Sequence, residues 1–205
     1  MECTLGAKQA IEAPHVDRRE LPMKQPNEFV AIDVETANAD LASICQIGVV
    51  FFTDECVSHT WQSLVNPEDR FDPVNVSIHG IDEDDVQEAP RFPERASHLA
   101  DLLGGQTVVS HTAFDRASLQ RVHEKYGLPH FACTWLDTAK VSRRAWTRFA
   151  RKGHGLADVA AFLDIEFRHH DALEDARAAG LVLLRAIGIR DYVTIRVISG
   201  GWGTG

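Results

Sequence analysis

The stretch Phe29-Val30-Ala31-Ile32-Asp33-Val34-Glu35-Thr36 carries two carboxylates at the end of an apolar segment. Its β-branched residues are typical of a buried strand. Residues two apart in a strand point the same way, so Asp33 and Glu35 share one face of the expected sheet. Burying an unpaired carboxylate costs roughly several kcal/mol. A divalent cation that prefers oxygen ligands would offset this cost. The alternative is one exposed carboxylate beside one salt-bridged carboxylate.

The composition is that of a globular domain. The chain has 205 residues, 44% hydrophobic and 25% charged, which is enough for one core. No apolar run approaches the roughly 18 to 20 residues of a membrane span, and the N-terminus lacks the apolar core of a signal peptide. We therefore expect a cytoplasmic protein with no membrane partner. Cys3, Cys45, Cys56 and Cys133 form no C-x-x-C pair, which favours reduced thiols.

The charge distribution is uneven. A formal net charge of -9 argues at first against nucleic acid as a partner. The segment from Lys140 to Lys152, however, is basic and contains no acidic residue. If the segment is one helix, Lys140, Arg144, Arg148 and Arg151 form a single stripe. This stripe is either a solvated helix face or a surface on which Arg144 and Arg148 bind substrate phosphates.

The order of apolar segments predicts an α/β fold. Three strands with short loops come first, and helices and strands then alternate, which is typical of a mixed sheet. We expect a flexible leader at 1–26, a domain at 27–190 and a tail or linker at 191–205. The expected strands are 28–34, 44–52, 59–65, 107–110, 131–136 and a short one at 193–198; the expected helices are 92–103, a helix ending near 126, the basic segment, 156–163 and a last helix from about 172.

The last helix has a strong start signal. Asp171-Ala172-Leu173-Glu174 fits a capping box, with Asp171 as the N-cap and Glu174 at the third helical position. Small residues at 176, 179 and 180 permit a close approach to the sheet. His170 then lies outside the helix, free to turn toward Asp175. That placement suits a general base.

Four motifs resemble one known family. They are Ile32-Asp33-Val34-Glu35-Thr36, Ser77-Ile78-His79-Gly80-Ile81 in a connecting loop, His111-Thr112-Ala113-Phe114-Asp115, and His170-Asp171-Ala172-Leu173-Glu174-Asp175-Ala176. In order and spacing they resemble the DEDDh 3'-5' exonucleases. Within that group the chain is most similar to the proofreading (epsilon) subunit of bacterial DNA polymerase III and its stand-alone relatives. The resemblance covers about residues 28–188.

The resemblance implies an RNase H-like fold, with a five-stranded mixed sheet and helices on both faces. It also implies that two divalent ions, Mg²⁺ or Mn²⁺, are held by Asp33, Glu35, Asp115 and Asp175. Two ions about 3.5 to 4 Å apart can activate a water and stabilise the leaving oxygen of a phosphoryl displacement. His170 would be the general base. His169 is the alternative, and the family spacing selects His170.

The resemblance further implies that Thr36, His79 and Phe114 contact the 3'-terminal nucleotide. For Phe114 the alternative is a plain core aromatic residue. Thr112 departs from the family, which often has Asn at this position. The departure concerns the hydrogen bonds around the metal ligands and not the ligands themselves. The sequence thus predicts a metal-dependent 3'-5' exonuclease that acts on single-stranded DNA or DNA 3' ends, with a DNA polymerase as a candidate partner. The alternatives are an RNA or oligoribonucleotide exonuclease and a catalytically silent module that binds nucleic acid or docks on a polymerase.

Overall fold

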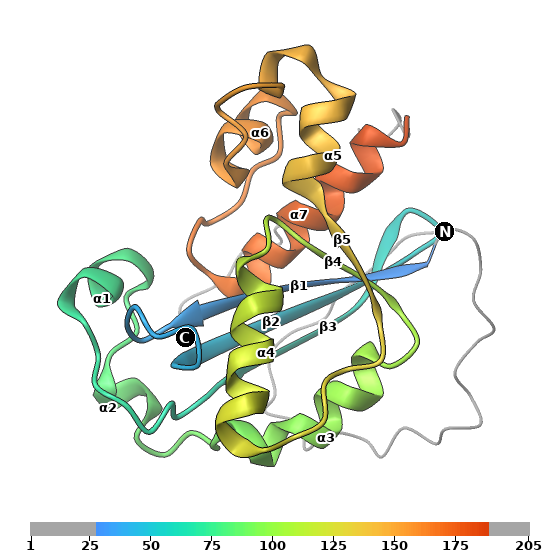
Figure 1. Cartoon of the computed structure of the whole chain (residues 1–205). Coiled ribbons are helices and arrows are strands. Elements are labelled where there is room, and N and C mark those ends of the chain that lie inside the picture. Colours follow the sequence, from blue (N-terminus) through green and yellow to red (C-terminus); the bar gives the residue numbers. More distant parts are fainter. Residues whose placement is uncertain (1–27, 189–205) are drawn as a thin grey trace, which may run out of the picture.

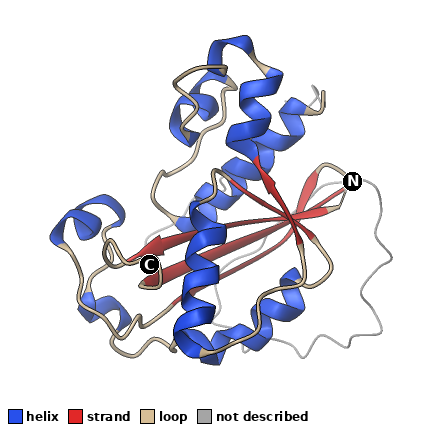
Figure 2. Ribbon diagram, in the orientation of Figure 1, coloured by secondary structure: helices blue, strands red, loops and turns tan. Residues whose placement is uncertain are grey.

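A computed structural model describes residues 28–188, so the expected leader, the strand at 193–198 and the C-terminal tail lie outside the described residues. The described chain folds around a five-stranded sheet in the order β3-β2-β1-β4-β5 (Figures 1 and 2). The strands are β1 Phe29–Thr36, β2 Ile44–Thr53, β3 Cys56–Leu64, β4 Thr107–Ser110 and β5 Thr134–Asp137. No helix among these residues is long and apolar enough to cross a membrane.

The strand directions make the sheet mixed. β1, β2 and β3 form an antiparallel meander, whereas β4 and β5 run parallel to β1. Asp54 and Glu55 make the tight turn between β2 and β3, and both have a positive φ. The fifth strand was expected at 131–136, but its ladder with β4 begins only at Thr134. Phe131 packs against the core instead of pairing with β4.

Helices cover both faces of the sheet, as expected. α3 (Phe92–Leu103) and α4 (Phe114–Tyr126) pack on the face that carries Val30 and Ile32. α7 (Ala172–Ala186) packs on the opposite face, over Ala31 and Phe52. The alternation of β1 side chains between two apolar layers explains why the first half of the strand, Phe29 to Ile32, is apolar on both faces. The α/β class and the mixed sheet are confirmed.

The connection from β3 to α3 is partly helical. α1 spans Pro73–His79 and α2 spans Glu83–Val86. The segment 77–81, expected as a loop, therefore supplies the last turn of a helix. The Asp72 side chain caps the first turn of α1, Pro73 opens it, and Gly80 ends it with φ 76°. These local signals outweigh the short length of the helix and fix His79 at its end.

The basic segment is not one helix, which corrects the expectation of a single stripe. α5 spans Thr138–Ala145, a 3-10 turn (η2) spans Thr147–Phe149, and α6 spans Leu156–Phe162. Trp146 between them is extended, with φ −130° and ψ 120°. Its ring packs edge-on against Phe149 and Phe162. Burial of this aromatic cluster outweighs helix continuation, because apolar burial exceeds the helix propensity of a few residues.

The start of α7 differs in one detail from the expected capping box. The Asp171 side chain accepts hydrogen bonds from the Leu173 and Glu174 N–H groups, as predicted. The Glu174 carboxylate instead pairs with Arg177 at 2.7 Å. Only half of the box forms, and the N-cap alone fixes the start of the helix. Within residues 28–188, no disulfide involves Cys45, Cys56 or Cys133.

Candidate active site

Four carboxylates from three elements meet at the end of β1. Asp33 and Glu35 lie on the face of β1 that α7 covers, and oxygens of Asp33, Glu35 and Asp175 lie within 4.8 Å of one another. Asp115 reaches the same point from the first turn of α4, where its Oδ1 accepts the Val34 N–H at 3.1 Å. After burial, the nearby Asp115 carboxyl contributes most to raising the pKa of Asp33. The structure therefore brings together all four acids that the sequence singled out.

Gly48 and Gln46 bring the N-terminus of α7 to these acids. Gly48 pairs with Asp33 across the β1–β2 ladder. A Cβ at Gly48 would lie 2.3 Å from the carbonyl carbon of Ala172, so only glycine leaves room for α7. The Gln46 side chain accepts the Ala172 N–H at 3.1 Å. The sequence analysis missed both residues, although a glycine inside an apolar strand indicates a close backbone approach.

In the absence of a cation, the four neighbouring carboxylates disfavour one another's charged forms. Burial, followed by the charges of Asp175 and Asp115, raises the pKa of Glu35 to about 8. Burial also raises the pKa of Asp115 to about 7. The pKa values of Asp33 and Asp175 are raised chiefly by the same desolvation. Four convergent carboxylates offer only oxygen donors, so the site fits a hard divalent cation.

Two histidines lie at the mouth of this site and hold different positions. The His169 Nδ1 is hydrogen-bonded to both carboxylate oxygens of Asp175, at 2.9 and 3.1 Å. The His170 Nδ1 lies 4.0 Å from Glu35 Oε1. The two rings are stacked, with centroids 3.8 Å apart. His169 is thus bound to one ligand candidate, whereas His170 faces the acids without a hydrogen bond from its side chain to any described residue.

His170 is held from its backbone. It has φ 66°, an uncommon conformation for a residue other than glycine. Its N–H donates to Asp175 Oδ2 at 3.1 Å. Partial burial and the neighbouring His169 and His79 lower the pKa of His170. A neutral imidazole that can accept a proton follows from this environment.

Thr36 and His79 join α1 to the end of β1. The Thr36 carbonyl accepts hydrogen bonds from Asn75 Nδ2 at 2.8 Å and from His79 Nε2 at 3.2 Å. The His79 Nδ1 accepts the Ile81 N–H at 3.1 Å, so both ring nitrogens are occupied. Thr36 is buried. In this structure the two residues position the edge of the site, and their expected contacts with a nucleotide stay predictions.

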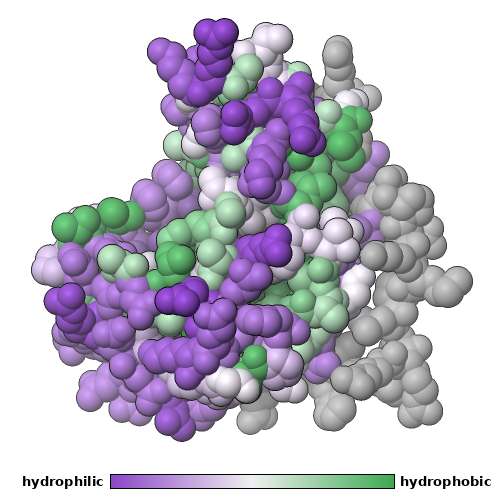
Figure 3. Space-filling model, in the orientation of Figure 1, coloured by the Kyte–Doolittle hydropathy of each residue, from purple (hydrophilic) through white to green (hydrophobic). Residues whose placement is uncertain are grey.

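Three exposed apolar side chains lie on elements next to the end of β1. Phe114 begins α4 directly before Asp115 and is 41% exposed, so the alternative of a core aromatic residue is wrong. Val74 and Ile78 of α1 are also exposed, and Figure 3 shows hydrophobic side chains gathered over α1. The sequence analysis missed Val74 and Ile78. The signal in the sequence was their four-residue spacing directly after Pro73, which places them on one side of a helix.

The loop between β4 and α4 tolerates the unusual Thr112. Its φ is 84°, a region that Asn and Gly adopt more readily than a β-branched residue. The Thr112 Oγ1 accepts the Phe114 N–H at 3.3 Å. His111 is anchored behind the loop by the Thr138 hydroxyl and the His154 carbonyl, at 2.9 and 2.8 Å. These contacts hold the loop that positions Asp115.

Arg144 and Arg148 lie on separate elements. Arg144 lines an open basic hollow with Lys140 and Arg143 of α5. Arg148 of η2 lies over the rings of Phe149 and Phe162, at 6.0 and 5.6 Å from their centroids. Both arginines are exposed. α5 and η2 contact one another, but Arg148 does not line the hollow, and neither arginine has a hydrogen bond or ion pair with the acids of the site among residues 28–188.

The fold agrees with the comparisons to known proteins. The chain belongs to the RNase_T exonuclease family, whose sequence profile matches residues 30–183. Among curated relatives, DNA polymerase III PolC-type of Caldanaerobacter subterraneus is 28% identical over 84% of this chain and 12% of its own length. The 3'-5' exonuclease DinG of Staphylococcus haemolyticus is 25% identical over 77% of this chain and 18% of its own length. The chain thus spans less than a fifth of these relatives.

Solved structures share the fold. The nuclease domain of 3'hExo, a DEDDh family member bound to rAMP, superposes with a TM-score of 0.66 at 21% identity, over 80% of this chain and 94% of that chain. Exonuclease X in complex with 5' overhanging duplex DNA gives a TM-score of 0.64 at 23% identity, over 78% and 92%. The RNase H-like fold of DEDDh exonucleases is therefore the fold of this chain.

Proposed function

We propose that this domain is a metal-dependent 3'-5' exonuclease that removes nucleotides from the 3' end of DNA. The observation that supports this proposal is the convergence of oxygens of Asp33, Glu35 and Asp175 within 4.8 Å, with Asp115 held beside them by its hydrogen bond from the Val34 N–H. Family membership gives the reaction class, hydrolysis of a nucleic acid from an end. The 3' polarity rests on the relatives' names and on the DEDDh fold.

The four acids would hold two divalent ions, Mg²⁺ or Mn²⁺. Such a pair would polarise the phosphate, lower the pKa of a bound water and stabilise the negative charge on the leaving 3' oxygen. The chain's own contribution is to fix the donors on rigid elements: a strand end for Asp33 and Glu35, and two helix N-termini for Asp115 and Asp175. Rigid elements position ligands more accurately than loops.

We assign the general base to His170. Its lowered pKa keeps the ring neutral near neutral pH, and its side chain has no competing hydrogen bond among residues 28–188. His169 is the weaker candidate because its Nδ1 is already bound to Asp175. A base with a free acceptor nitrogen can take the proton of an attacking water.

Three groups of residues would contact the substrate. Phe114, with Val74 and Ile78, offers exposed apolar surface to the last bases. Thr36 and His79 shape the edge of the site through the hydrogen bond between His79 Nε2 and the Thr36 carbonyl. Arg144 and Arg148 would contact substrate phosphates beyond the acids.

DNA is the proposed substrate because the relatives named DNA polymerase III PolC-type cover most of this chain. The same names suggest a DNA polymerase as partner. RNA is the second candidate, since one similar structure is bound to rAMP. A panel of end-labelled single-stranded DNA, 3'-recessed DNA and RNA, with Mg²⁺ or Mn²⁺, tests these alternatives. Stepwise shortening of DNA from the 3' end supports the proposal, preference for RNA selects the second candidate, and no digestion favours a silent binding module.

A further inference from the structure

Two groups of metal-ligating side chains overlap at the acidic site, within the part of the chain that the structure describes. One is the set of Asp33, Glu35 and Asp175. The other consists of His169, His170 and Asp175, and each of these residues offers one ligand atom within 4.8 Å of the other two. The second group has two imidazoles and one carboxylate, so its donors differ in kind from those of the first.

The side chains of the second group are already in contact. The His169 Nδ1 lies 2.9 Å from Asp175 Oδ2 and 3.1 Å from Oδ1. The two imidazole rings are stacked with their centroids 3.8 Å apart, and the His170 N–H holds Asp175 Oδ2 at 3.1 Å. The donors around a four-coordinate zinc ion lie roughly 3.3 Å apart, so small side-chain rotations would bring the three groups to one ion.

The group is open to an ion from solvent. The side chains of His169 and His170 are 39% and 40% exposed, whereas that of Asp175 is buried beneath them. The carboxylate of Glu35 lies 4.0 Å from His170 Nδ1 and adds negative charge beside the group. A cation can therefore enter past the two rings and meet a favourable potential.

The donor set favours zinc over magnesium. Imidazole nitrogen suits Zn²⁺, whereas Mg²⁺ takes oxygen ligands. Two histidines and one carboxylate leave a fourth position for water, which is a common arrangement around zinc in proteins. The two overlapping groups thus differ in the ion that they prefer.

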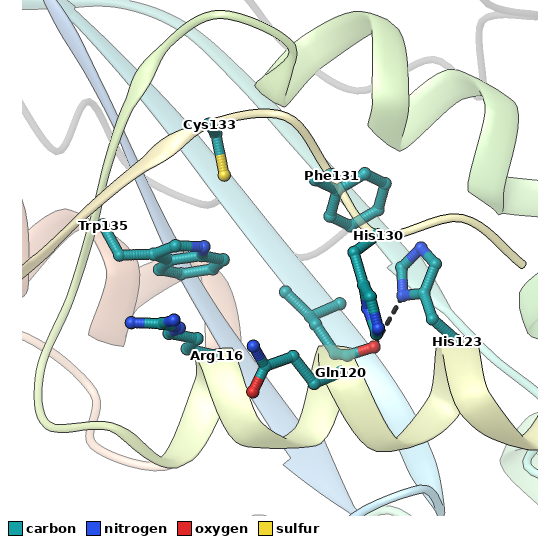
Figure 4. A pocket seen from close by; sticks show the side chains of 8 residues that line it. Arg116, Gln120, His123, His130, Phe131, Cys133 and Trp135 are labelled. Atoms are coloured by element: carbon teal, nitrogen blue, oxygen red, sulfur yellow. Dashed lines mark hydrogen bonds between the residues drawn. The ribbon is translucent and has the colours of Figure 1, made fainter.

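The other histidines near a cysteine do not form such a group. The pocket between α4 and residues 130–135 (Figure 4) carries His123, His130 and Cys133, and it lies on the sheet face that α3 and α4 cover, opposite the acids. The His123 Nδ1 is hydrogen-bonded to the Leu119 carbonyl at 2.6 Å, and the rings of His123 and His130 are 5.9 Å apart. These side chains are not among the groups of the described chain that could hold one ion.

We propose that His169, His170 and Asp175 form an inhibitory Zn²⁺ site. Zinc bound to one ring nitrogen of His170 leaves the ring's proton on the other, so no nitrogen remains to accept the proton of a water. The ion also engages Asp175, which the proposed Mg²⁺ site uses. This inference rests on the proposed exonuclease function, and it adds regulation of the same site by a metal with a preference for nitrogen.

Calorimetric titration of the purified full chain with Zn²⁺, in excess Mg²⁺, tests the site without any need for activity. His169→Asn keeps an amide donor for Asp175 but removes the imidazole ligand. Loss of a side chain behind a metal ligand weakens metal affinity about 10- to 100-fold, so loss of the ligand itself should weaken Zn²⁺ binding at least about tenfold. His169 is exposed, and we expect the variant to fold. His130→Asn, at an exposed histidine of the pocket in Figure 4, is the matched control and should bind Zn²⁺ as the wild type does.

Cleavage of labelled single-stranded DNA at saturating Mg²⁺ tests the inhibition. The free Zn²⁺ concentration that halves each protein's own zinc-free rate should rise at least about tenfold in His169→Asn and stay unchanged in His130→Asn. Zinc binding through His169 that leaves cleavage unaffected would reject the inhibitory role.

Equal Zn²⁺ affinity in the wild type and His169→Asn, or no Zn²⁺ binding by the wild type, would overturn the site. If the wild type cleaves no DNA in the absence of zinc, the exonuclease proposal fails instead. The calorimetric comparison then still decides whether the zinc site exists.

Discussion

The backbone of Ala172 at the start of α7 lies where the side chain of residue 48 would be, with only 2.3 Å between a Cβ at Gly48 and the Ala172 carbonyl carbon. Gly48 is the β2 partner of Asp33. One missing side chain thus sets the distance between the acids of β1 and Asp175 of α7.

Replacing Gly48 with Ala should push the start of α7 away from the sheet. Overpacking of this kind costs about 1 to 3 kcal/mol of unfolding free energy. It should also lower the affinity for Mn²⁺, because Asp175 moves with the helix. Thermal unfolding and calorimetric Mn²⁺ titration measure both effects. Gly155→Ala is the control, since its nearest neighbour would be 4.0 Å from the new Cβ. Wild-type metal affinity in Gly48→Ala would show that this close approach does not position the acids.

Removing a carboxylate should abolish turnover but preserve the fold. Asp33→Ala and Asp175→Ala each delete one ligand candidate from the acidic group. We expect loss of nuclease activity and weaker Mn²⁺ binding, with a far-UV circular dichroism spectrum like that of the wild type. Asp84→Ala, an acid on the exposed α2, should change neither property. Retained activity in either site variant would remove that residue from the metal site.

The stability of the metal-free protein should fall as the pH rises. The pKa of Glu35 is raised to about 8 and that of Asp115 to about 7, so the folded state holds protons that the unfolded chain releases near pH 4. The unfolding free energy then decreases between about pH 4 and pH 8.

Thermal unfolding in EDTA across this range measures the decrease, and Mg²⁺ should reduce it by neutralising the carboxylates. Glu35→Gln should have a flatter profile than the wild type. A melting temperature in EDTA that stays constant or rises from acidic to alkaline pH contradicts the electrostatic description of the site.

The two histidines should differ in their effects on kcat. His170→Ala removes the proposed base and should lower kcat by roughly 10² to 10⁴. His169→Ala removes a hydrogen bond to Asp175 and should lower kcat by less than about tenfold. Steady-state kinetics at saturating metal compares them. A larger loss of kcat in His169→Ala than in His170→Ala would reverse the assignment.

The basic surface should affect substrate binding more than chemistry. Arg144→Gln and Arg148→Gln should raise KM and flatten its dependence on salt, because fewer counterions are displaced from the phosphates. Arg148 also packs over Phe149 and Phe162, so its variant needs a check of thermal stability. Arg121→Gln is the matched control. An unchanged KM in both variants would make this surface an ordinary solvated one.

The sequence alone predicted the sheet and the acids because their signals are local. The apolar run around Asp33 defines a strand, and its period of two places Glu35 on the same face. The N-cap Asp171 fixes the start of α7 and hence the place of Asp175. Sequence reasoning failed where contacts between segments far apart in the sequence determine the local structure. Trp146 breaks the basic segment by packing against Phe162, which local periodicity does not reveal.

The same limit applies inside the site. The roles of Gly48 and Gln46 depend on a helix that follows more than a hundred residues later. The hydrogen bond between His169 and Asp175 likewise depends on a turn in which His170 has a positive φ. From the sequence, the choice of His170 over His169 depended on the motif spacing of the family that the chain resembles. Hydrogen bonds seen in the fold give an independent physical reason for the same choice.

The central claim is that the four acids form one metal site for 3'-5' hydrolysis, and digestion of 5'-labelled single-stranded DNA tests it most directly. With Mg²⁺ or Mn²⁺ the purified chain should produce a ladder that shortens one nucleotide at a time from the 3' end, and EDTA or Asp33→Ala should abolish it. Intact DNA in the presence of both metals, or a ladder that survives EDTA and Asp33→Ala, would contradict the account.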